Sequence, residues 1–413
     1  MTQSSLLPIH NFSLPDDALP LGFRFTAVKA GLKPSGNPDF AVAVADAPAS
    51  AAAMFTVNRV KAAPITIGAQ HLAHRGSKVR VLAVNAGNAN CATGEIGLAA
   101  CKTVCAAAAK TFGASENQVF PSSTGIIGVP LPAEKLVAAL PEVERSLAAD
   151  SEHFSAFARA IMTTDTRPKI AAARITVNGQ TIRIAGLCKG AGMIHPQLVP
   201  HATLLVYIFT DAAIAPPDLD GMLRDAVEVT FNRISIDGDT STNDTVLLLA
   251  SGASGVVIKA GDATFTTALK EICASLARQI LDDGEGVTHV VELQIEGAAT
   301  DADALKVAKA IAHSPLVKTA WAGSDPNWGR LMAATGYSGA KVEPDRIAIW
   351  LGDQQICVNG GRVPDFDEQR AHAYLKNREF TVRIDLGIGG GHCRFWTTDL
   401  TAEYVHINAD YST

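Results

Sequence analysis

The stretch AARITVNGQTIRIA, residues 172–185, places Asn178-Gly179 between two short strand-like runs. Asn-Gly in this setting is a strong signal for a two-residue hairpin turn, because both residues tolerate the positive φ angles that the turn requires. A hairpin joins antiparallel strands. The stretch therefore predicts antiparallel sheets rather than a doubly wound parallel sheet.

Strand-like runs and helix-patterned segments alternate along the rest of the chain. The expected strands are residues 79–84, 203–209, 246–249, 290–295 and 380–386, and the expected helices are 96–112, 133–140, 152–162, 217–231, 265–281 and 302–313. Alanine-rich pieces at 49–53 and 106–109 are interpreted as close-packing surfaces. The sequence predicts an α+β fold with sheets layered between helices, and composition marks no domain boundary.

Composition excludes several classes of function. The chain has 413 residues, 47% of them hydrophobic, which is enough for two packed lobes or one large domain. Its formal charge of -6 gives no basic excess for nucleic acid or an anionic membrane. The first 21 residues contain no Lys or Arg, and no apolar run is long enough to span a membrane. We expect a cytoplasmic protein.

The seven cysteines form no Cys-x-x-Cys pair, which favours a reducing compartment. Cys101 and Cys105 lie one turn apart on an expected helix and could ligate a metal, but no second pair accompanies them. We therefore interpret these cysteines as buried residues that act as small apolar side chains.

A glycine-rich segment, KGAGMIH (189–195), leads through residues 196–201 to Ala202-Thr203 and an apolar run. A threonine at the start of such a run is usually an ordinary β-branched strand residue. The local pattern alone therefore gives Thr203 no special role.

The order of motifs along the chain changes this interpretation. The motifs are SSTGIIG (122–128), TTDT (163–166), the 189–195 segment, Ala202-Thr203, DGDTSTND (237–244), GEG (284–286), DPNWGR (325–330), DLT (399–401) and the tail 404–411. In this order, and over nearly the whole chain, they resemble the ornithine acetyltransferase family, the glutamate N-acetyltransferases of the cyclic arginine pathway.

The resemblance implies an N-terminal-nucleophile-like, self-processed fold. The precursor would cut itself between Ala202 and Thr203, giving an α chain (1–202) and a β chain (203–413) that assemble as α2β2. A threonine hydroxyl needs a base within reach, and the new α-amino group, with a pKa of about 7.7 to 8.0, can supply one. The Thr124 hydroxyl and the Gly125 N–H would form the oxyanion hole.

The resemblance also assigns the substrate contacts. It places Lys189, Thr163, Glu285, Asn408 and the C-terminal Thr413 around the polar groups of the substrates. Thr203 would take the acetyl group from N2-acetyl-L-ornithine and pass it to L-glutamate, with no metal or organic cofactor. The sequence leaves open whether acetyl-CoA is also used.

The chain departs from the family pattern before the cut. The spacing from Lys189 to Thr203 is three residues longer than usual, and the insertion in 197–201 includes Pro200, which stiffens the loop. His195 and His201 flank this loop, and we expect exposed loop histidines rather than a base. His289 stands where the family more often has lysine, and could alter the charge near the substrate or lie on the surface.

Two other motifs have two interpretations. Residues 387–391, GIGGG, resemble a phosphate loop but lack its Lys-Ser/Thr, which favours strand-end glycines. Asp237 and Asp239 could bind a cation or cap turns.

Two rival functions remain. An N-terminal-nucleophile amidase or aminopeptidase would use the same threonine but pass the acyl group to water. A non-catalytic relative would stay uncut because of its longer loop.

Overall fold

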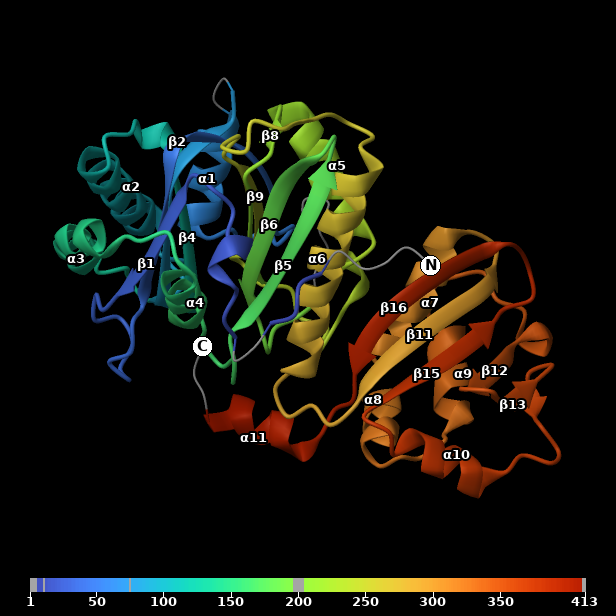
Figure 1. Ribbon diagram of the computed structural model, residues 1–413. Coiled ribbons are helices and arrows are strands. Elements are labelled where there is room, and N and C mark those ends of the chain that lie inside the picture. Colours follow the sequence, from blue (N-terminus) through green and yellow to red (C-terminus); the bar gives the residue numbers. More distant parts are fainter. Residues whose placement is uncertain (1–5, 10–11, 74–75, 196–203, 411–413) are drawn as a thin grey trace.

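The computed structural model describes residues 6–9, 12–73, 76–195 and 204–410, arranged as two lobes, each built on one sheet (Figure 1). The first lobe contains an eight-stranded sheet in the order β4-β3-β2-β9-β7-β6-β5, with β1 also paired to β2. These strands are β1 (Phe23–Val28), β2 (Phe40–Phe55), β3 (Lys78–Asn88), β4 (Val119–Ile126), β5 (Lys169–Val177), β6 (Gln180–Lys189), β7 (Leu205–Thr210) and β9 (Thr245–Ala250).

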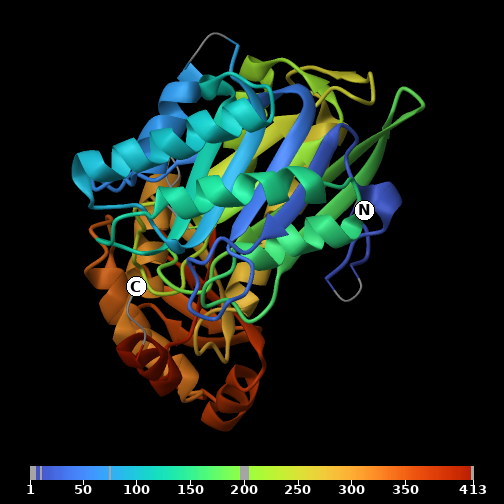
Figure 2. The same ribbon diagram turned by 90° about the vertical axis from the view of Figure 1, so that its left-hand side faces the viewer.

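The sheet bends over at β2, whose first half pairs with β1 and β3 and whose second half pairs with β9. The two halves pack face to face, with the ring of Phe209 of β7 lying 5.2 Å from that of Phe23 and 5.0 Å from that of Phe25 in β1. The helices α5 (Pro216–Glu228) and α6 (Ala263–Asp282) cover the outer side of one half, and α2 (Gly94–Thr111) and α3 (Ala133–Ser146) cover the outer side of the other (Figure 1 and Figure 2). The helix α1 (Ala63–Ala73) lies beside β4, and α4 (Ser151–Ala160) packs its Phe154 and Phe157 on Phe25. The sheets are therefore layered between helices, as expected.

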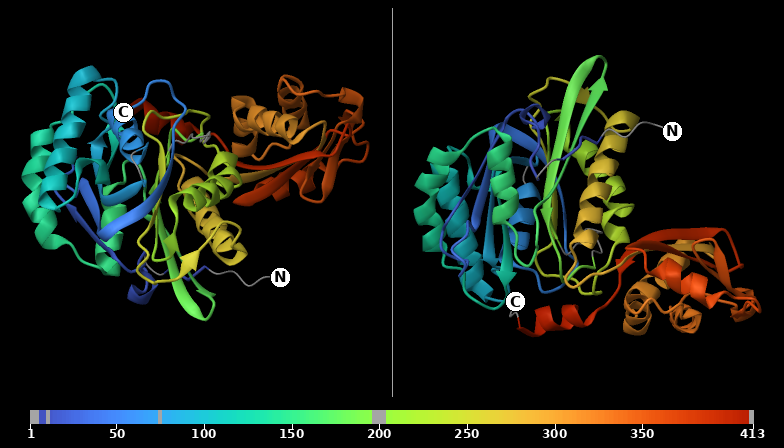
Figure 3. Two further views of the ribbon diagram at one scale, coloured as in Figure 1. Left: turned by 90° about the horizontal axis from the view of Figure 1, so that it is seen from above. Right: turned by 60° about the horizontal axis from the view of Figure 1, so that its bottom comes forward.

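The second lobe is a six-stranded sheet in the order β14-β13-β12-β15-β11-β16 with helices packed on it (Figure 3). Its strands are β11 (Val290–Ala298), β12 (Ala348–Leu351), β13 (Gln354–Val358), β14 (Gly361–Arg362), β15 (Glu379–Asp385) and β16 (Gly391–Thr398). Its helices are α7 (Asp301–Ala312), α8 (Pro315–Ala322), α9 (Trp328–Gly336) and α10 (Glu368–Leu375). A last helix, α11 (Ala402–Asp410), runs back beneath the first lobe.

Short elements complete the described part of the chain. β8 (Ala213–Ile214) and β10 (Val257–Ile258) form a two-stranded sheet. The 3-10 helices are η1 (Asp16–Ala18), η2 (Glu116–Gln118), η3 (Phe231–Arg233) and η4 (Pro344–Arg346). No described helix has the length and apolar character needed to cross a membrane.

The hairpin at Asn178-Gly179 is confirmed. Asn178 and Gly179 have φ angles of +53° and +77°, and β5 and β6 pair antiparallel on either side. Most pairs in the two large sheets are antiparallel, as expected, and three are parallel. β3 pairs parallel with β4, β7 with β9, and β11 with β15. Each of these pairs is joined by a long connection that contains a helix, as parallel pairing requires.

The alanine-rich piece at 49–53 lies inside β2, a strand that the pattern did not predict. Ala51, Ala52 and Ala53 pair with Leu249, Leu248 and Leu247 of β9 in the middle of the sheet. Small side chains there let α5 pack closely on β2. The interpretation as a close-packing surface therefore agrees with the structure, although the strand itself was missed.

The glycines at 387–391 connect β15 to β16, as strand-end glycines do. A Cβ at Gly389 would lie 2.4 Å from the Ala298 oxygen, and one at Gly391 would lie 2.3 Å from the Thr300 carbonyl carbon. The crowded backbone explains these glycines without a phosphate ligand.

Candidate active site

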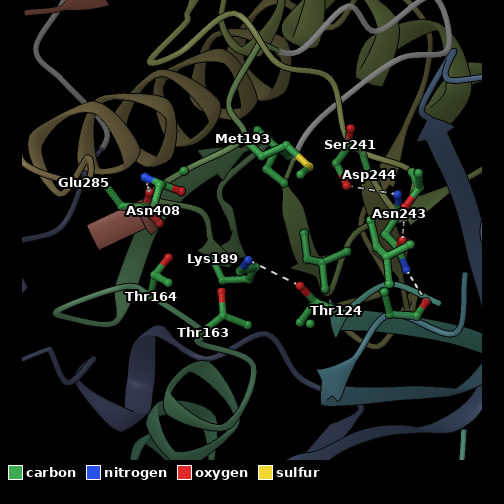
Figure 4. Close-up of a pocket in the computed structure, with 17 residues that line it drawn as sticks. Thr124, Thr163, Thr164, Lys189, Met193, Ser241, Asn243, Asp244, Glu285 and Asn408 are labelled. Atoms are coloured by element: carbon green, nitrogen blue, oxygen red, sulfur yellow. Dashed lines mark hydrogen bonds between the residues drawn. The ribbon is translucent and has the colours of Figure 1, made fainter. Parts of the chain in front are cut away.

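A pocket opens at one edge of the first sheet, where the carboxyl ends of β4 and β6 meet the amino ends of β7 and β9 (Figure 4). Its lining brings together most of the residues that the motifs singled out. The lining residues are Ala89, Thr124, Gly125, Ile127, Thr163, Thr164, Lys189, Gly192, Met193, Leu204, Leu205, Ser241, Thr242, Asn243, Asp244, Glu285 and Asn408.

The expected cut itself, Ala202-Thr203, and the C-terminal Thr413 lie outside the described residues. Leu204, the next residue along the chain, is buried and lines the pocket. The Leu204 oxygen accepts the Thr245 N–H at 2.8 Å, and Leu205 pairs with Lys189 in the sheet. Leu204, the second residue after the expected cut, is thus fixed at the pocket by the start of β7.

Thr124 and Lys189 face each other across the pocket. The Lys189 Nζ donates to the Thr124 Oγ1 at 3.3 Å. Because this oxygen accepts from lysine, the threonine hydroxyl proton remains able to point toward a ligand. Gly125, with φ +127°, allows no side chain, since a Cβ would lie 2.3 Å from the Gly87 carbonyl carbon. This contact holds the end of β4 directly against β3.

Lys189 lies in an electrostatic environment set by buried charges. Burial lowers the pKa of Lys189 and the ammonium of Lys169 lowers it further, while Asp165 acts in the opposite direction. Burial alone would raise the pKa of Asp165, but Lys169 and Lys189 outweigh it and bring that pKa to about 2. Asp165 is therefore an anion beside the pocket lysine at any ordinary pH.

Asp165 belongs to an ion cluster that sequence reasoning missed. The Lys169 Nζ lies 2.6 Å from a carboxylate oxygen of Asp165 and 2.6 Å from one of Asp283, and the Lys169 side chain is completely buried. Asp165 also accepts the N–H groups of Gly190 at 2.7 Å and Thr163 at 3.1 Å. Its only sequence signal was its place in the TTDT motif, between Thr163 and the later Lys189 segment.

Glu285 lies in the loop after α6 and Asn408 lies in α11, and their side chains meet on the opposite side of the pocket from Thr124. The Asn408 Nδ2 donates to the Glu285 Oε2 at 2.8 Å. Gly192 packs on this carboxylate so closely that a Cβ would lie 2.3 Å from the Glu285 Oε2. Thr163 and Thr164 line the floor between this pair and Lys189. The pocket therefore offers a cation on one side and a carboxylate on the other.

Asn243 is a second site residue that the sequence did not single out by itself, although it lies in the DGDTSTND motif. Its Nδ2 donates to the oxygens of Ala89 at 2.6 Å and Ser123 at 2.9 Å. It thereby ties the start of β9 to the ends of β3 and β4. This bridge fixes the distance between Thr124 and the residues that precede β9.

The expectation of an exposed His195 is wrong. His195 is 2% exposed, and its Nδ1 lies 3.2 Å from the Nε2 of His313. Burial, and then the charges of Lys318 and Lys309, lower the pKa of His313 to about 4. His195 is not among the residues that line the pocket, and it borders a separate hollow together with His313 and Gly238. His201 lies outside the described residues.

His289 is also buried rather than on the surface. Its Nδ1 lies 3.0 Å from the Asp399 Oδ2, and its own N–H donates to the Asp399 Oδ1 at 3.0 Å. The surface interpretation is therefore wrong, and an effect on the charge near the substrate stays a prediction, because His289 is not among the residues that line the pocket.

The remaining candidates have structural roles. Cys101 and Cys105 are buried in α2, and the described residues contain no cluster of three or more His, Cys, Asp or Glu that could hold a metal. Asp237 accepts the N–H groups of Met193 and Ile194, as a turn cap does.

Comparison with known proteins agrees with the motif order. The model of the ArgJ family matches residues 24–413. The chain belongs to the ArgJ family. It is 45% identical over 396 residues to the arginine biosynthesis bifunctional protein ArgJ of Geobacter sulfurreducens, covering 95% of this chain and 99% of that protein. The corresponding protein of Rhizobium meliloti is 43% identical, with 94% and 95% covered.

Solved structures of ArgJ proteins are similar to part of the chain. The crystal structure of ArgJ from Bacillus halodurans is 43% identical and covers 49% of this chain and 96% of its own, with a TM-score of 0.47. The ornithine acetyltransferase of Mycobacterium tuberculosis, complexed with ornithine, is 32% identical and covers 48% and 98%, with a TM-score of 0.42. The family expected from the motifs is confirmed by the family match and the curated relatives, and the protein is an acetyl-transferring enzyme of arginine biosynthesis.

Proposed function

We propose that the chain moves the acetyl group of N2-acetyl-L-ornithine to L-glutamate through an acetyl ester on Thr203. One observation supports this above the others. Leu204, the residue after Thr203, lies in the same pocket as Thr124, Gly125, Lys189 and Glu285. A nucleophile at position 203 would therefore be placed among an oxyanion hole, a cation and a carboxylate.

Self-cleavage comes first in this scheme. The Thr203 hydroxyl attacks the Ala202 carbonyl, the peptide nitrogen leaves as an amine, and water hydrolyses the resulting ester. The cut separates residues 1–202 from 203–413 and frees the α-amino group of Thr203. That amine then serves as the base for its own hydroxyl.

Acetyl transfer follows in two half-reactions. The amine takes the Thr203 hydroxyl proton as the oxygen attacks the acetyl carbonyl, and the oxyanion forms against the Thr124 hydroxyl and the Gly125 N–H. Collapse breaks the amide bond, and the departing ornithine amine receives the proton. The amine of glutamate then attacks the ester carbonyl. The ester bond breaks, the Thr203 oxygen takes the proton, and N-acetylglutamate leaves.

Substrate recognition rests on the charges in the pocket. Lys189 suits the α-carboxylate that both substrates carry, and Glu285 suits the side-chain ammonium of ornithine. The side-chain amide of Asn408 has both a donor and an acceptor, so it can bind Glu285 and can also bind the carboxylate of glutamate. Thr163 and Thr413 are assigned to the remaining polar groups. The scheme requires no cofactor.

Several finer features stay predictions. These are the α2β2 assembly of processed protomers, the cytoplasmic location, and the use of acetyl-CoA as a second acetyl donor.

Product analysis distinguishes transfer from hydrolysis. Acetylornithine is incubated with the protein in the presence and absence of glutamate, and free ornithine, acetate and N-acetylglutamate are measured. We expect ornithine release to depend on glutamate and to match N-acetylglutamate formation, because the pocket must protect the ester from water. Release of acetate at the same rate without glutamate would indicate an amidase instead.

A further inference from the structure

Residues 190–194 connect β6 to the segment that contains the expected cut, and hydrogen bonds hold several of their backbone N–H and C=O groups. The Gly190 N–H donates to Asp165 at 2.7 Å, and the Ala191 oxygen accepts the Glu285 N–H at 2.9 Å. The Ile194 oxygen accepts the Ile236 N–H at 2.7 Å. A loop held in this way has a defined shape, although it has no regular secondary structure.

Met193 is the strained point of this segment. Its φ angle is +55°, in the left-handed region that a methionine adopts only under outside constraint. The neighbouring Gly192 packs on the carboxylate of Glu285. The conformation of Met193 therefore determines whether Gly192 keeps its place against a substrate-binding side chain.

The Asp237 carboxylate supplies the constraint. One oxygen accepts the Met193 N–H at 2.6 Å and the Tyr404 hydroxyl at 3.2 Å. The other accepts the Ile194 N–H at 2.7 Å and the Asp239 N–H at 3.3 Å. Four donors from three segments thus converge on one carboxylate, and none of them belongs to the reacting groups.

Tyr404 connects the Asp237 carboxylate to the C-terminal helix. It lies on α11, one turn before Asn408, which bonds to Glu285. None of the residues of α11 is buried, so polar contacts such as these, and the bond from Thr401 to the Gly286 oxygen at 2.6 Å, hold the helix in place. Asp237 is the group that joins the 190–194 segment to the helix that closes the other side of the pocket.

We propose that Asp237 is a positioning residue that holds residues 190–194 and α11 in register around the pocket, and that both self-cleavage and substrate binding depend on it. The dependence of the reaction rests on the proposed function, whereas the hold on the backbone does not. A displacement of about 1 Å in a catalytic segment can reduce a rate about a hundredfold. Asp237 can therefore affect the chemistry without touching a substrate.

Asp237→Asn is the informative substitution because the shape is kept while one oxygen becomes an NH2 group. That group can accept no hydrogen bond, so two of the four donors lose their partner whichever way the amide faces. Asp225→Asn makes the same chemical change on an exposed residue of α5 and serves as the matched control. Tyr404→Phe removes the link to α11 alone.

The test combines a backbone readout with two functional ones. Amide hydrogen exchange of residues 190–194 is measured in the full chain of each variant, together with the rate of fragment formation by intact mass and the kcat and KM for acetylornithine. For Asp237→Asn we expect exchange and KM to rise, and cleavage to slow, each by about tenfold or more. Asp225→Asn should match the parent, and Tyr404→Phe should raise KM while cleavage stays at the parent rate.

The outcomes separate the two claims. Parent-like exchange in Asp237→Asn would show that Asp237 does not hold the segment. Faster exchange with unchanged cleavage and KM would also overturn the proposal, because the segment would then be held without consequence for the reaction. A parent chain that is neither cut nor active would refute the proposed function, and the exchange result would still decide the role of Asp237 in the fold.

Discussion

Thr124 is the residue whose expected role agrees best with its surroundings. The Thr124 hydroxyl oxygen accepts a hydrogen bond from Lys189, and Thr124 is 8% exposed. The next residue, at position 125, can only be glycine. These contacts leave the hydroxyl proton as the group that can face a developing negative charge.

Replacement of Thr124 by valine keeps the shape and removes the hydroxyl. We expect kcat for acetyl transfer to fall by about two to three orders of magnitude, because one oxyanion donor is lost, while KM changes little. Thr124→Ser keeps the hydroxyl and should retain most of the activity. Steady-state kinetics on processed protein of both variants provides the measurement, and equal activity of the valine variant would exclude Thr124 from the oxyanion hole.

At this scale the sequence predicted the pocket through motif order rather than through local pattern. Thr124, Gly125, Thr163, Lys189, Glu285 and Asn408 all line it, although they come from positions spread over most of the chain. Asn243 was missed because its partners Ala89 and Ser123 are distant in sequence. Asp165 was missed because its cluster is completed by the distant Gly190 and Asp283, and the nearby Lys169 alone gives no signal of a buried ion cluster. His195 and His289 were placed wrongly because a lone histidine carries no signal of burial, which only the fold decides.

Elements with strong periodicity were predicted well. The helices expected at 265–281 and 302–313 correspond to α6 and α7 within two residues at each end. β2 was missed because alanine has low strand propensity and its place between β3 and β9 is a property of the whole sheet. The helix expected to end at residue 140 continues through Pro141 to Ser146.

The element α8 carries a buried lysine that makes stability depend on pH. Lys318 donates to Thr397, and also to the Thr398 oxygen, and burial lowers its pKa to about 7 although Asp399 and Asp237 act against this. Between about pH 7 and its usual value of 10.5, the unfolded chain binds more protons at this group than the folded chain. The contribution of Lys318 to folding therefore becomes more favourable as pH rises through this range.

Lys318→Met should remove that dependence. We expect the free energy of unfolding of the parent to rise, relative to the variant, by up to about 1 kcal/mol per pH unit between pH 7 and 9.5. Denaturant unfolding at several pH values measures the difference. Lys306→Met, on an exposed lysine of α7, is the control and should show no such slope; a parallel course of parent and Lys318→Met would mean that Lys318 titrates as in water.

The whole molecule explains how a cut chain can remain folded. β7 and β9 follow the expected cut, yet they lie in the sheet between β2 and β6, which precede it. The cut would therefore sever the connection between two paired neighbours, β6 and β7, without removing any strand from the sheet. The two lobes do not correspond to the two chains, and this is why composition showed no boundary at residue 202.

The two fragments should accordingly behave as one particle. We expect fragments 1–202 and 203–413 to elute together in gel filtration under native conditions and to separate only in denaturant, because the hydrogen bonds of β2 with β9 and of β6 with β7 join them. Separation in native buffer would contradict the arrangement of the sheet.

The central claim, that Thr203 cuts the chain and then carries the acetyl group, is tested most directly by comparing the parent with Thr203→Ala. Intact mass and acetylornithine-to-glutamate transfer are measured on the same samples. The parent should give two fragments split between Ala202 and Thr203 and transfer acetyl, and the variant should remain a single chain of 43.2 kDa without activity. A processed or fully active Thr203→Ala would show that the nucleophile is another residue.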